Sequence, residues 1–156
     1  MNIVFGSDHA GFAMREALRA FAAASGHRVW SVGATSEAAY DYPDAADVAV
    51  ADVLSGKAER AVLLCGTGIG MSIRANRHLG IRAANCCNEA MAELARRHNH
   101  ANVLCVGARL LDIPAAEAIL ARFLDTGEDT DARHVHRVEG LDRALRGQSE
   151  ENGCLG

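Results

Sequence analysis

The stretch Ala61-Val62-Leu63-Leu64-Cys65-Gly66-Thr67-Gly68-Ile69-Gly70 decides the fold. Its first five residues are continuously apolar, which is typical of a strand buried on both faces of a parallel sheet. Three alternating glycines follow at once and lead into a helical pattern over Met71–His78. A buried strand that turns through glycines into a helix indicates an α/β protein with parallel strands.

Strand-like and helix-like segments alternate on both sides of this stretch. The expected strands are Ile3–Gly6, Val29–Val32, Ala61–Cys65, Ile81–Ala84 and Asn102–Gly107. The expected helices are Gly11–Ala24, Asp44–Leu54, Met71–His78, Asn88–Arg97, Pro114–Leu124 and His134–Leu145. We therefore predict one domain over residues 1–146, with a five-stranded parallel sheet and helices on both faces. The polar tail, residues 147–156, is expected to be flexible.

Composition argues against several classes of function. The 156 residues carry a net charge of −4 and only 4% aromatic side chains, so we expect no nucleic-acid or membrane-surface partner. Apolar runs fall well short of the roughly 20 residues that span a bilayer, and the amino terminus does not resemble a signal peptide. The five cysteines are odd in number and lack CxxC spacing. These features predict a cytoplasmic protein with reduced thiols.

In an open parallel sheet, ligands bind outside the carboxyl ends of the strands, where the strand order switches. The segments that follow the five expected strands are therefore the candidate site. They are Ser7-Asp8-His9, Tyr40–Tyr42, Cys65–Gly70, Asn85-Cys86-Cys87 and Ala108-Arg109.

The glycine-rich turn is the strongest of these candidates. The backbone N–H groups of Gly66, Gly68 and Gly70 could converge on an anion at the start of the next helix. The turn is neither a dinucleotide fingerprint nor a P-loop, because Met71 replaces the third glycine and no Gly-Lys-Ser/Thr follows. Cys65 lies at its mouth, where a thiolate is favoured as a base or nucleophile. The alternative is a tight turn without a ligand and a structural cysteine.

Two histidine-containing segments have more than one interpretation. Asp8 and His9 could move protons on substrate hydroxyls, or Asp8 could cap the following helix. His98 closes the fourth helix, where a cation is also favoured by the helix dipole. A metal is a further reading, since His-x-His occurs at His98 and again at His134. We expect no metal, because neither pair has a carboxylate or cysteine at ligand spacing.

Arg133 and Arg137 are one helical turn apart and therefore share a face. They fall in the first turns of the last helix, where the dipole disfavours cations. This placement indicates an external anion, and arginine forks suit phosphate. The alternative is pairing with the acidic residues of the loop 128–131. Arg109, after the fifth strand, is a further candidate ligand for phosphate.

With these residues in view, the chain resembles the type B ribose-5-phosphate isomerases and the related galactose-6-phosphate isomerase subunits. The Cys-Gly-Thr-Gly block is the most specific part of the resemblance, which runs from Gly6 to Glu139. The blocks that carry it are Gly6–Gly11, Asp41–Pro43, Cys65–Gly70, His98-Asn99, Asn102–Leu104, Arg133-His134 and Arg137–Glu139.

The resemblance implies a three-layer Rossmann-like sandwich that needs no cofactor, and a catalytic set at the Cys65 end of the sheet. Cys65 would be the base that moves a proton between C1 and C2 of the sugar. Some family members use a glutamate in the following helix instead, but Met71–Arg74 contains none. His98 would open the furanose ring, and Asp8 and Thr67 would assist at the substrate hydroxyls.

The resemblance also implies the binding residues and the assembly. Asn99 and Tyr42 would orient the sugar, and the phosphate ligands would be His9, Arg109, Arg133 and Arg137. A homodimer, or a tetramer built from two dimers, would hold active sites between its subunits. In that assembly His98, Asn99 and Arg109 would enter from the neighbouring subunit.

Four functions can be weighed on these residues. The leading hypothesis is interconversion of ribose 5-phosphate and ribulose 5-phosphate through an enediolate, whose oxyanion the glycine amides would stabilise. The same chemistry on allose or galactose 6-phosphate is the close alternative. A non-catalytic phosphosugar-binding regulator would not need Cys65, Asp8 and His98 together. A thiol redox protein, suggested by Cys86-Cys87, is disfavoured by the absence of CxxC.

Overall fold

The computed structural model describes the backbone of residues 1–152 and the side chains of residues 1–143. Strands and helices alternate along the described chain, as the sequence predicts. The elements are β1 (Asn2–Ser7), α1 (Phe12–Ala24), β2 (Arg28–Gly33), α2 (Tyr42–Leu54), β3 (Arg60–Cys65), α3 (Ile69–Ala75), β4 (Ala83–Asn85), α4 (Glu89–Asn99), β5 (Val103–Gly107), α5 (Ile113–Asp125) and α6 (Ala132–Asn152).

The five strands form one parallel sheet in the order β2-β1-β3-β5-β4, which confirms the predicted α/β fold. The chain moves from β1 outward to β2 and then crosses to β3 on the other side of β1. The strand order therefore switches between β1 and β3, and the carboxyl ends of these two strands flank the expected ligand position. β3 ends at Cys65 and β1 ends at Ser7.

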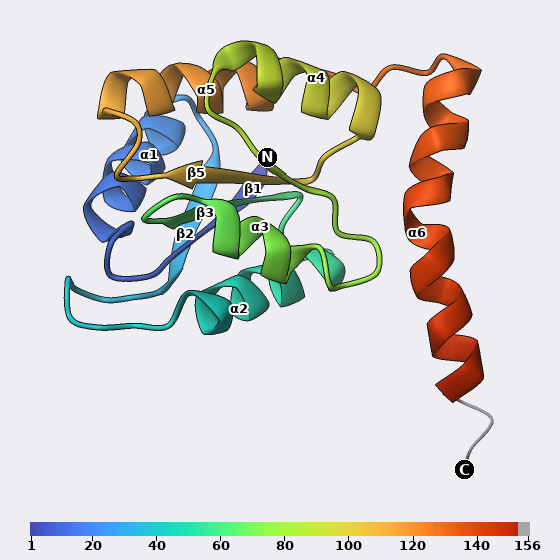
Figure 1. Ribbon diagram of the computed structural model, residues 1–156. Helices are drawn as coiled ribbons and strands as arrows, with labels where there is room; N and C mark the ends of the chain where they lie inside the picture. Colours follow the sequence, from blue (N-terminus) through green and yellow to red (C-terminus); the bar gives the residue numbers. More distant parts are fainter. Residues whose placement is uncertain (153–156) are drawn as a thin grey trace.

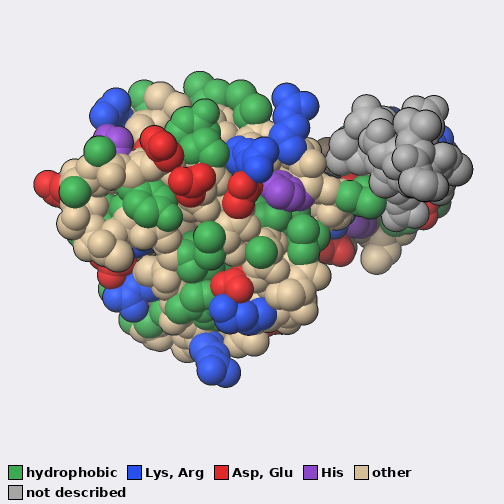
Figure 2. Space-filling model, turned by 90° about the horizontal axis from the view of Figure 1, so that it is seen from below, with side chains coloured by type: hydrophobic (Ala, Val, Ile, Leu, Met, Phe, Trp, Pro, Cys, Tyr) green, Lys and Arg blue, Asp and Glu red, His purple; other side chains and the backbone are tan. Residues whose placement is uncertain are grey.

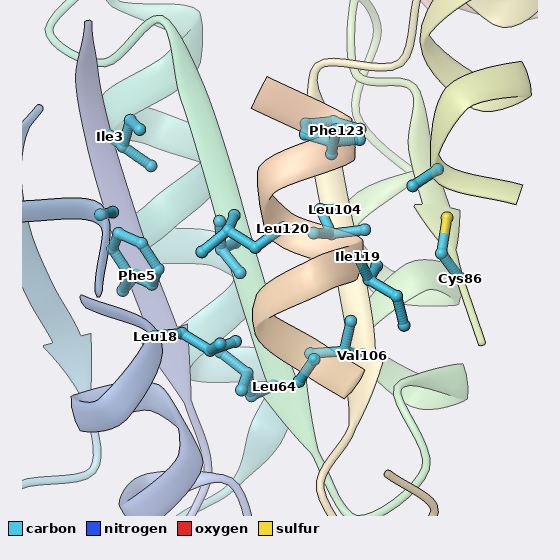
Figure 3. Packing of buried hydrophobic residues seen from close by; sticks show 14 of the residues in the cluster. Ile3, Phe5, Leu18, Leu64, Cys86, Leu104, Val106, Ile119, Leu120 and Phe123 are labelled. Carbon is cyan, nitrogen blue, oxygen red and sulfur yellow. The ribbon is translucent and has the colours of Figure 1, made fainter. Parts of the chain in front are cut away.

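Helices cover both faces of the sheet (Figure 1). On one face, α1, α4 and α5 pack over a core that includes Phe5, Leu104 and Phe123 (Figure 3). On the other face, α2 and α3 pack over a second core that includes Leu63 and Met71. β3 and β5 are buried almost throughout because helices lie above and below them. This double burial holds the end of β3 in one position.

The fourth strand and the last helix differ from the expected ranges. β4 begins at Ala83 and not at Ile81, because the Asn76 amide bonds both the Ala83 N–H, at 2.8 Å, and the Ala83 carbonyl, at 2.9 Å. α6 runs to Asn152 and so includes residues 147–152 of the predicted tail. The rest of that tail, residues 153–156, lies outside the described residues.

Helix α6 stands away from the α/β body and meets it mainly near the end of α4 (Figure 1). An ion pair between Arg82 and Asp142, with 3.5 Å between Nη1 and Oδ2, ties its middle to the start of β4. A cavity of about 390 Å³ lies in this region, and its lining includes Asn99, Leu141 and Asp142. Within residues 1–152, the helices are too short or too polar to cross a membrane.

Two glycines with the same backbone conformation give a matched test of packing at the end of β2. Gly33 (φ +86°) and Gly26 (φ +85°) both lie in the left-handed region, where a side chain costs about 1–2 kcal/mol. A Cβ on Gly33 would strike the Ser7 carbonyl oxygen and the Ala45 side chain, whereas a Cβ on Gly26 would meet nothing. Gly33→Ala should therefore destabilise the fold by about 1–3 kcal/mol more than Gly26→Ala. Urea unfolding measures the difference, and equal losses would contradict this packing.

Candidate active site

Cys65 is the last residue of β3 and is held by the neighbouring strands. Its carbonyl accepts a hydrogen bond from the Ala108 N–H at 2.9 Å, and the Leu64 carbonyl accepts one from the Asp8 N–H at 3.2 Å. The side chain is 5% exposed, and its Sγ accepts a hydrogen bond from the Gly68 N–H at 3.1 Å. This bond holds the sulfur at the mouth of the glycine turn.

Asp8 lies directly beside this sulfur-bearing strand end. One carboxylate oxygen, Oδ1, accepts the Gly11 N–H at 2.9 Å and so turns the chain toward α1. The alternative prediction of a helix cap by Ser7 or Asp8 is wrong, because Gly11 is the N-cap of α1 and no side chain caps the helix. The bond to Gly11 instead fixes the Asp8 carboxyl group near the ligand edge. Close by, the His9 Nδ1 lies 3.3 Å from the Tyr40 carbonyl oxygen. Asp8 and His9 thus meet Cys65 at the switch point, as the sequence predicts.

The glycines of the turn allow two larger side chains to lie directly on it. A Cβ on Gly66 would come within 3.3 Å of the Arg109 side chain, and one on Gly70 within 2.7 Å of the Tyr42 ring. The structure thus brings Arg109 and Tyr42 to the same edge as Cys65. Within one chain, the Arg109 guanidinium packs on the turn that follows Cys65. Its expected entry into the site of a neighbouring subunit stays a prediction.

Thr67 is exposed at the top of the turn, and its Oγ1 accepts the Ile69 N–H at 3.4 Å. Gly68 takes a left-handed conformation, with φ at +76°, which directs its N–H toward Cys65. The hydroxyl of Thr67 and the Gly68 amide thus both lie in the turn that follows Cys65. We call Asp8, His9, Tyr42, Cys65–Gly70 and Arg109 the Cys65 edge.

His98 and Asn99 lie at the other end of the sheet. They end α4, which runs back from the carboxyl edge so that β5 can begin at Val103. The four steps from Val103 to Gly107, beside Cys65, span roughly 13 Å at the usual rise of a strand. The structure therefore does not bring His98 and Asn99 together with Cys65 within one chain.

His98 instead belongs to a second cluster, formed with the start of α6. Its ring stacks on the ring of His134, with centroids 4.1 Å apart and planes 2° from parallel. Arg133 and Arg137 lie on the same helix and are exposed. We call His98, Asn99, Arg133, His134 and Arg137, with Asp129, the His98 edge.

The sequence offered two interpretations of Arg133 and Arg137: binding of an external anion, or pairing with acidic residues of the loop 128–131. Each arginine fits a different one. The Arg133 Nε lies 3.5 Å from Asp131 Oδ2, so the predicted pairing with a loop acid exists for this residue. Both groups are well exposed, and such pairs contribute little to stability. Arg137 makes no ion pair with the described residues. Its guanidinium therefore remains available to an external anion.

Sequence reasoning missed Asp129. Its N–H donates to the Arg97 carbonyl at 3.0 Å, which holds the loop against the end of α4. Ligand atoms of His98, Asp129 and His134 lie within 4.8 Å of one another. The sequence gives no spacing that predicts this trio, because its members come from α4, the following loop and α6.

The trio is a poor metal site in the geometry that the structure shows. Parallel imidazole rings point their in-plane lone pairs side by side, whereas a tetrahedral ion needs ligands that converge. The backbone N–H of Asp131 lowers the pKa of Asp129. Burial, and then His98, lower the pKa of His134. The arrangement therefore favours a neutral His134 ring stacked on the ring of His98.

Among the described residues, the buried cysteines Cys86 and Cys105 are poorly suited to a redox centre. Burial, and to a lesser degree Cys87, raise the pKa of Cys86 to about 12. Burial also raises the pKa of Cys105 well above its usual range. Both thiols are protonated at neutral pH and so are weak nucleophiles. The thiol redox hypothesis gains no support from this site.

Comparison with known proteins gives the family of this site. The family model described as Ribose/Galactose Isomerase matches residues 3–141, which include both edges. The chain belongs to the ribose/galactose isomerase family. It is an α/β isomerase of sugar phosphates.

Three relatives place the chain within the ribose/galactose isomerase family. Ribose-5-phosphate isomerase B of Escherichia coli (strain K12) is 37% identical over 89% of this chain and 93% of its own length. A ribose 5-phosphate isomerase of Thermotoga maritima, solved as a crystal structure, superposes with a TM-score of 0.89 at 44% identity, covering 91% of this chain and 97% of that one. D-erythrulose-4-phosphate isomerase 2 of Mycolicibacterium smegmatis is 35% identical over 90% of this chain and 95% of its own.

The buried His134 makes stability depend on pH. Its folded pKa lies below the ordinary 6.5, so the unfolded chain binds a proton more readily. Asp129 and Asp131 oppose this effect, while Arg133 adds to it. The stabilisation is complete above pH 6.5 and is lost as pH falls below it. Urea midpoints at fixed protein concentration should fall less steeply below pH 6.5 in His134→Phe than in wild type. Parallel pH profiles would contradict the assignment.

Proposed function

We propose that this isomerase interconverts ribose 5-phosphate and ribulose 5-phosphate, with Cys65 as the base. The observation that carries the proposal is the 3.1 Å hydrogen bond from the Gly68 N–H to the Cys65 Sγ, beside Asp8 at the switch in strand order. A sulfur at this edge, with backbone amides around it, has the parts that proton transfer through an enediolate requires.

The proposed reaction moves one proton and shifts one double bond. The Cys65 thiolate removes the proton from C2 of the open-chain aldose, and the electron pair of that bond forms a C1–C2 double bond. The carbonyl oxygen on C1 takes up the negative charge, which backbone amides of the turn other than those of Gly68 and Ile69 would stabilise. The new S–H returns the proton to C1, and the proton of the C2 hydroxyl passes to the O1 oxyanion, which gives the ketose with a C2 carbonyl and a C1 hydroxyl. Asp8 and Thr67 would relay the hydroxyl protons.

The choice of a five-carbon sugar rests on the relatives from Escherichia coli and Thermotoga maritima, which are named for ribose 5-phosphate. The Mycolicibacterium smegmatis relative is named for a four-carbon sugar phosphate, so sugar length varies among similar chains. A hexose 6-phosphate remains the alternative. Ratios of kcat/KM for four-, five- and six-carbon sugar phosphates separate these substrates, and a preference for the hexose would replace the leading proposal.

We also propose that the active sites lie between two subunits. The Cys65 edge holds the base and the oxyanion donors, and the His98 edge holds the ring-opening histidine and two arginines for phosphate. One chain keeps these edges apart, and a two-fold dimer can set the Cys65 edge of one copy against the His98 edge of the other. Arg109 and His9 would meet the phosphate from the Cys65 side.

Exposed apolar side chains next to the Cys65 edge support this dimer. Figure 2 looks onto the face formed by α2 and α3, where hydrophobic side chains lie among charged ones. Ile69 and Ile73, both on α3, are each 53% exposed, and Val48 on α2 is 48% exposed. A second copy that covers these residues would remove apolar surface from water. It would also exclude water from the neighbouring sulfur.

Replacing the base tests the reaction. Cys65→Ala should lower kcat by about 10²–10⁴-fold, the usual contribution of a positioned base, while binding of ribose 5-phosphate survives. Cys87→Ala is the matched control, because Cys87 is an exposed thiol whose loss should leave kcat unchanged. Isothermal titration measures binding. Full activity in Cys65→Ala would eliminate the proposed base.

Mixed dimers test the shared site. Cys65→Ala and His98→Ala should each be nearly inactive alone. A dimer with one copy of each variant, purified through two different tags, would contain one intact site and one doubly altered site. Its activity should recover to about half that of the wild-type dimer. Without recovery, both edges would have to act within one chain.

A further inference from the structure

Asn85 ends β4, directly outside the turn that carries the oxyanion donors. Its backbone is in register with Cys105 of β5, and its side chain reaches across to the turn after β3. There the Nδ2 donates a hydrogen bond to the Thr67 carbonyl oxygen at 3.3 Å. The proposed reaction assigns no role to this side chain.

The bond from Asn85 acts on the same peptide group that contacts Cys65. The Thr67 carbonyl and the Gly68 N–H belong to one planar peptide unit, which is trans. Holding the carbonyl oxygen from one side fixes the direction of the N–H on the other, where it donates to the Cys65 Sγ. A hydrogen bond to the carbonyl also polarises the unit and strengthens its N–H as a donor.

The packing around the Thr67–Gly68 peptide leaves little freedom for another arrangement. A Cβ on Gly107 would lie 2.7 Å from the Thr67 carbonyl oxygen, so the peptide sits directly on the end of β5. A Cβ on Gly68 would strike the Asn85 Oδ1, so the absence of a side chain there admits the amide. The peptide is therefore held between β5 and Asn85.

The orientation of the amide follows from its partner. A carbonyl only accepts hydrogen bonds, so Asn85 must present its NH₂ group to Thr67. This leaves the Oδ1 buried with no hydrogen-bond partner, which is unfavourable. A leucine, of similar size and branching, would fill this place without a buried oxygen. The unfavourable burial of the Oδ1 is explained if the NH₂ group is needed to hold the Thr67 carbonyl beside the active site.

We propose that Asn85 is a positioning residue that sets the reactivity of Cys65 by holding the Thr67–Gly68 peptide. The proposal rests on the proposed function, in which Cys65 is the base. Other groups also face Cys65, namely Asp8 after β1, Arg109 after β5, Cys105 within β5 and Tyr42 at the start of α2. All four are unchanged in the variants below, so differences between variants report on Asn85.

Thiolate absorbance in the ultraviolet, followed over a pH series, tests the proposal without requiring activity. The signal of Cys65 is the difference between each variant and the same variant with Cys65→Ala added. Asn85→Leu, which removes the donor, should raise the pH midpoint of this signal by about half a unit. Asn85→Ala should do the same, and it guards against overpacking by leucine.

Asn76→Leu is the matched control. Asn76 also bonds the backbone of β4 through its amide, but at the opposite end of that strand. Its loss should lower stability and leave both the thiolate midpoint and kcat unchanged. An equal shift in the Asn76 and Asn85 variants would overturn the proposal, because general loosening of β4 would then explain both.

Steady-state kinetics completes the test. Loss of positioning should lower kcat about three- to tenfold in Asn85→Leu with little change in KM, because the base and not substrate binding is affected. An unshifted midpoint in folded Asn85 variants overturns the proposal, as does a raised KM at unchanged kcat. Failure of Cys65 as the base would appear separately, as full activity in Cys65→Ala, while the Asn85 effect on the thiolate midpoint would still be measurable.

Discussion

The hydrogen bonds that extend the parallel ladder to the last residue of β3 support everything else at this site. Leu64 and Cys65 are bonded to the segments that follow β1 and β5, so the thiol cannot move away from Asp8 or from the glycine turn. Helices on both faces bury the strand, so only its carboxyl end is open to a ligand. The chemistry therefore depends on a strand that is fixed along its whole length.

Glycine makes the surroundings of that strand end possible. Tyr42 and Arg109 lie on Gly70 and Gly66, and Asn85 approaches Gly68. In each case a polar side chain occupies the space where a Cβ would stand. The turn is thus a compact set of amides covered by groups that can hold a sugar phosphate. The three glycines are therefore needed for two reasons: they form the turn, and they leave room for these side chains.

Apolar runs such as Ala61–Cys65 predict the strands, and the glycines that follow them predict where the strands end. Both signals lie within a few residues of sequence, so the sheet and the Cys65 edge could be predicted. The start of β4 was predicted two residues early, since the Asn76 amide sets it from outside the strand. Asp129 and the bond from Asn85 to Thr67 join segments far apart in sequence, and periodicity carries no signal for either. The packing of Arg109 on Gly66 also needs the folded geometry, because the two residues lie far apart in sequence.

The separation of the two edges has an evolutionary consequence. In the proposed reaction, proton transfer belongs to one end of the sheet, while α6 carries the arginines and His134 at the other. Mutations in α6 can alter the fit to a longer or shorter substrate without disturbing the sulfur and its amides. A chain built this way can change its preferred sugar through substitutions in one helix, while the strand end that carries the sulfur keeps its surroundings.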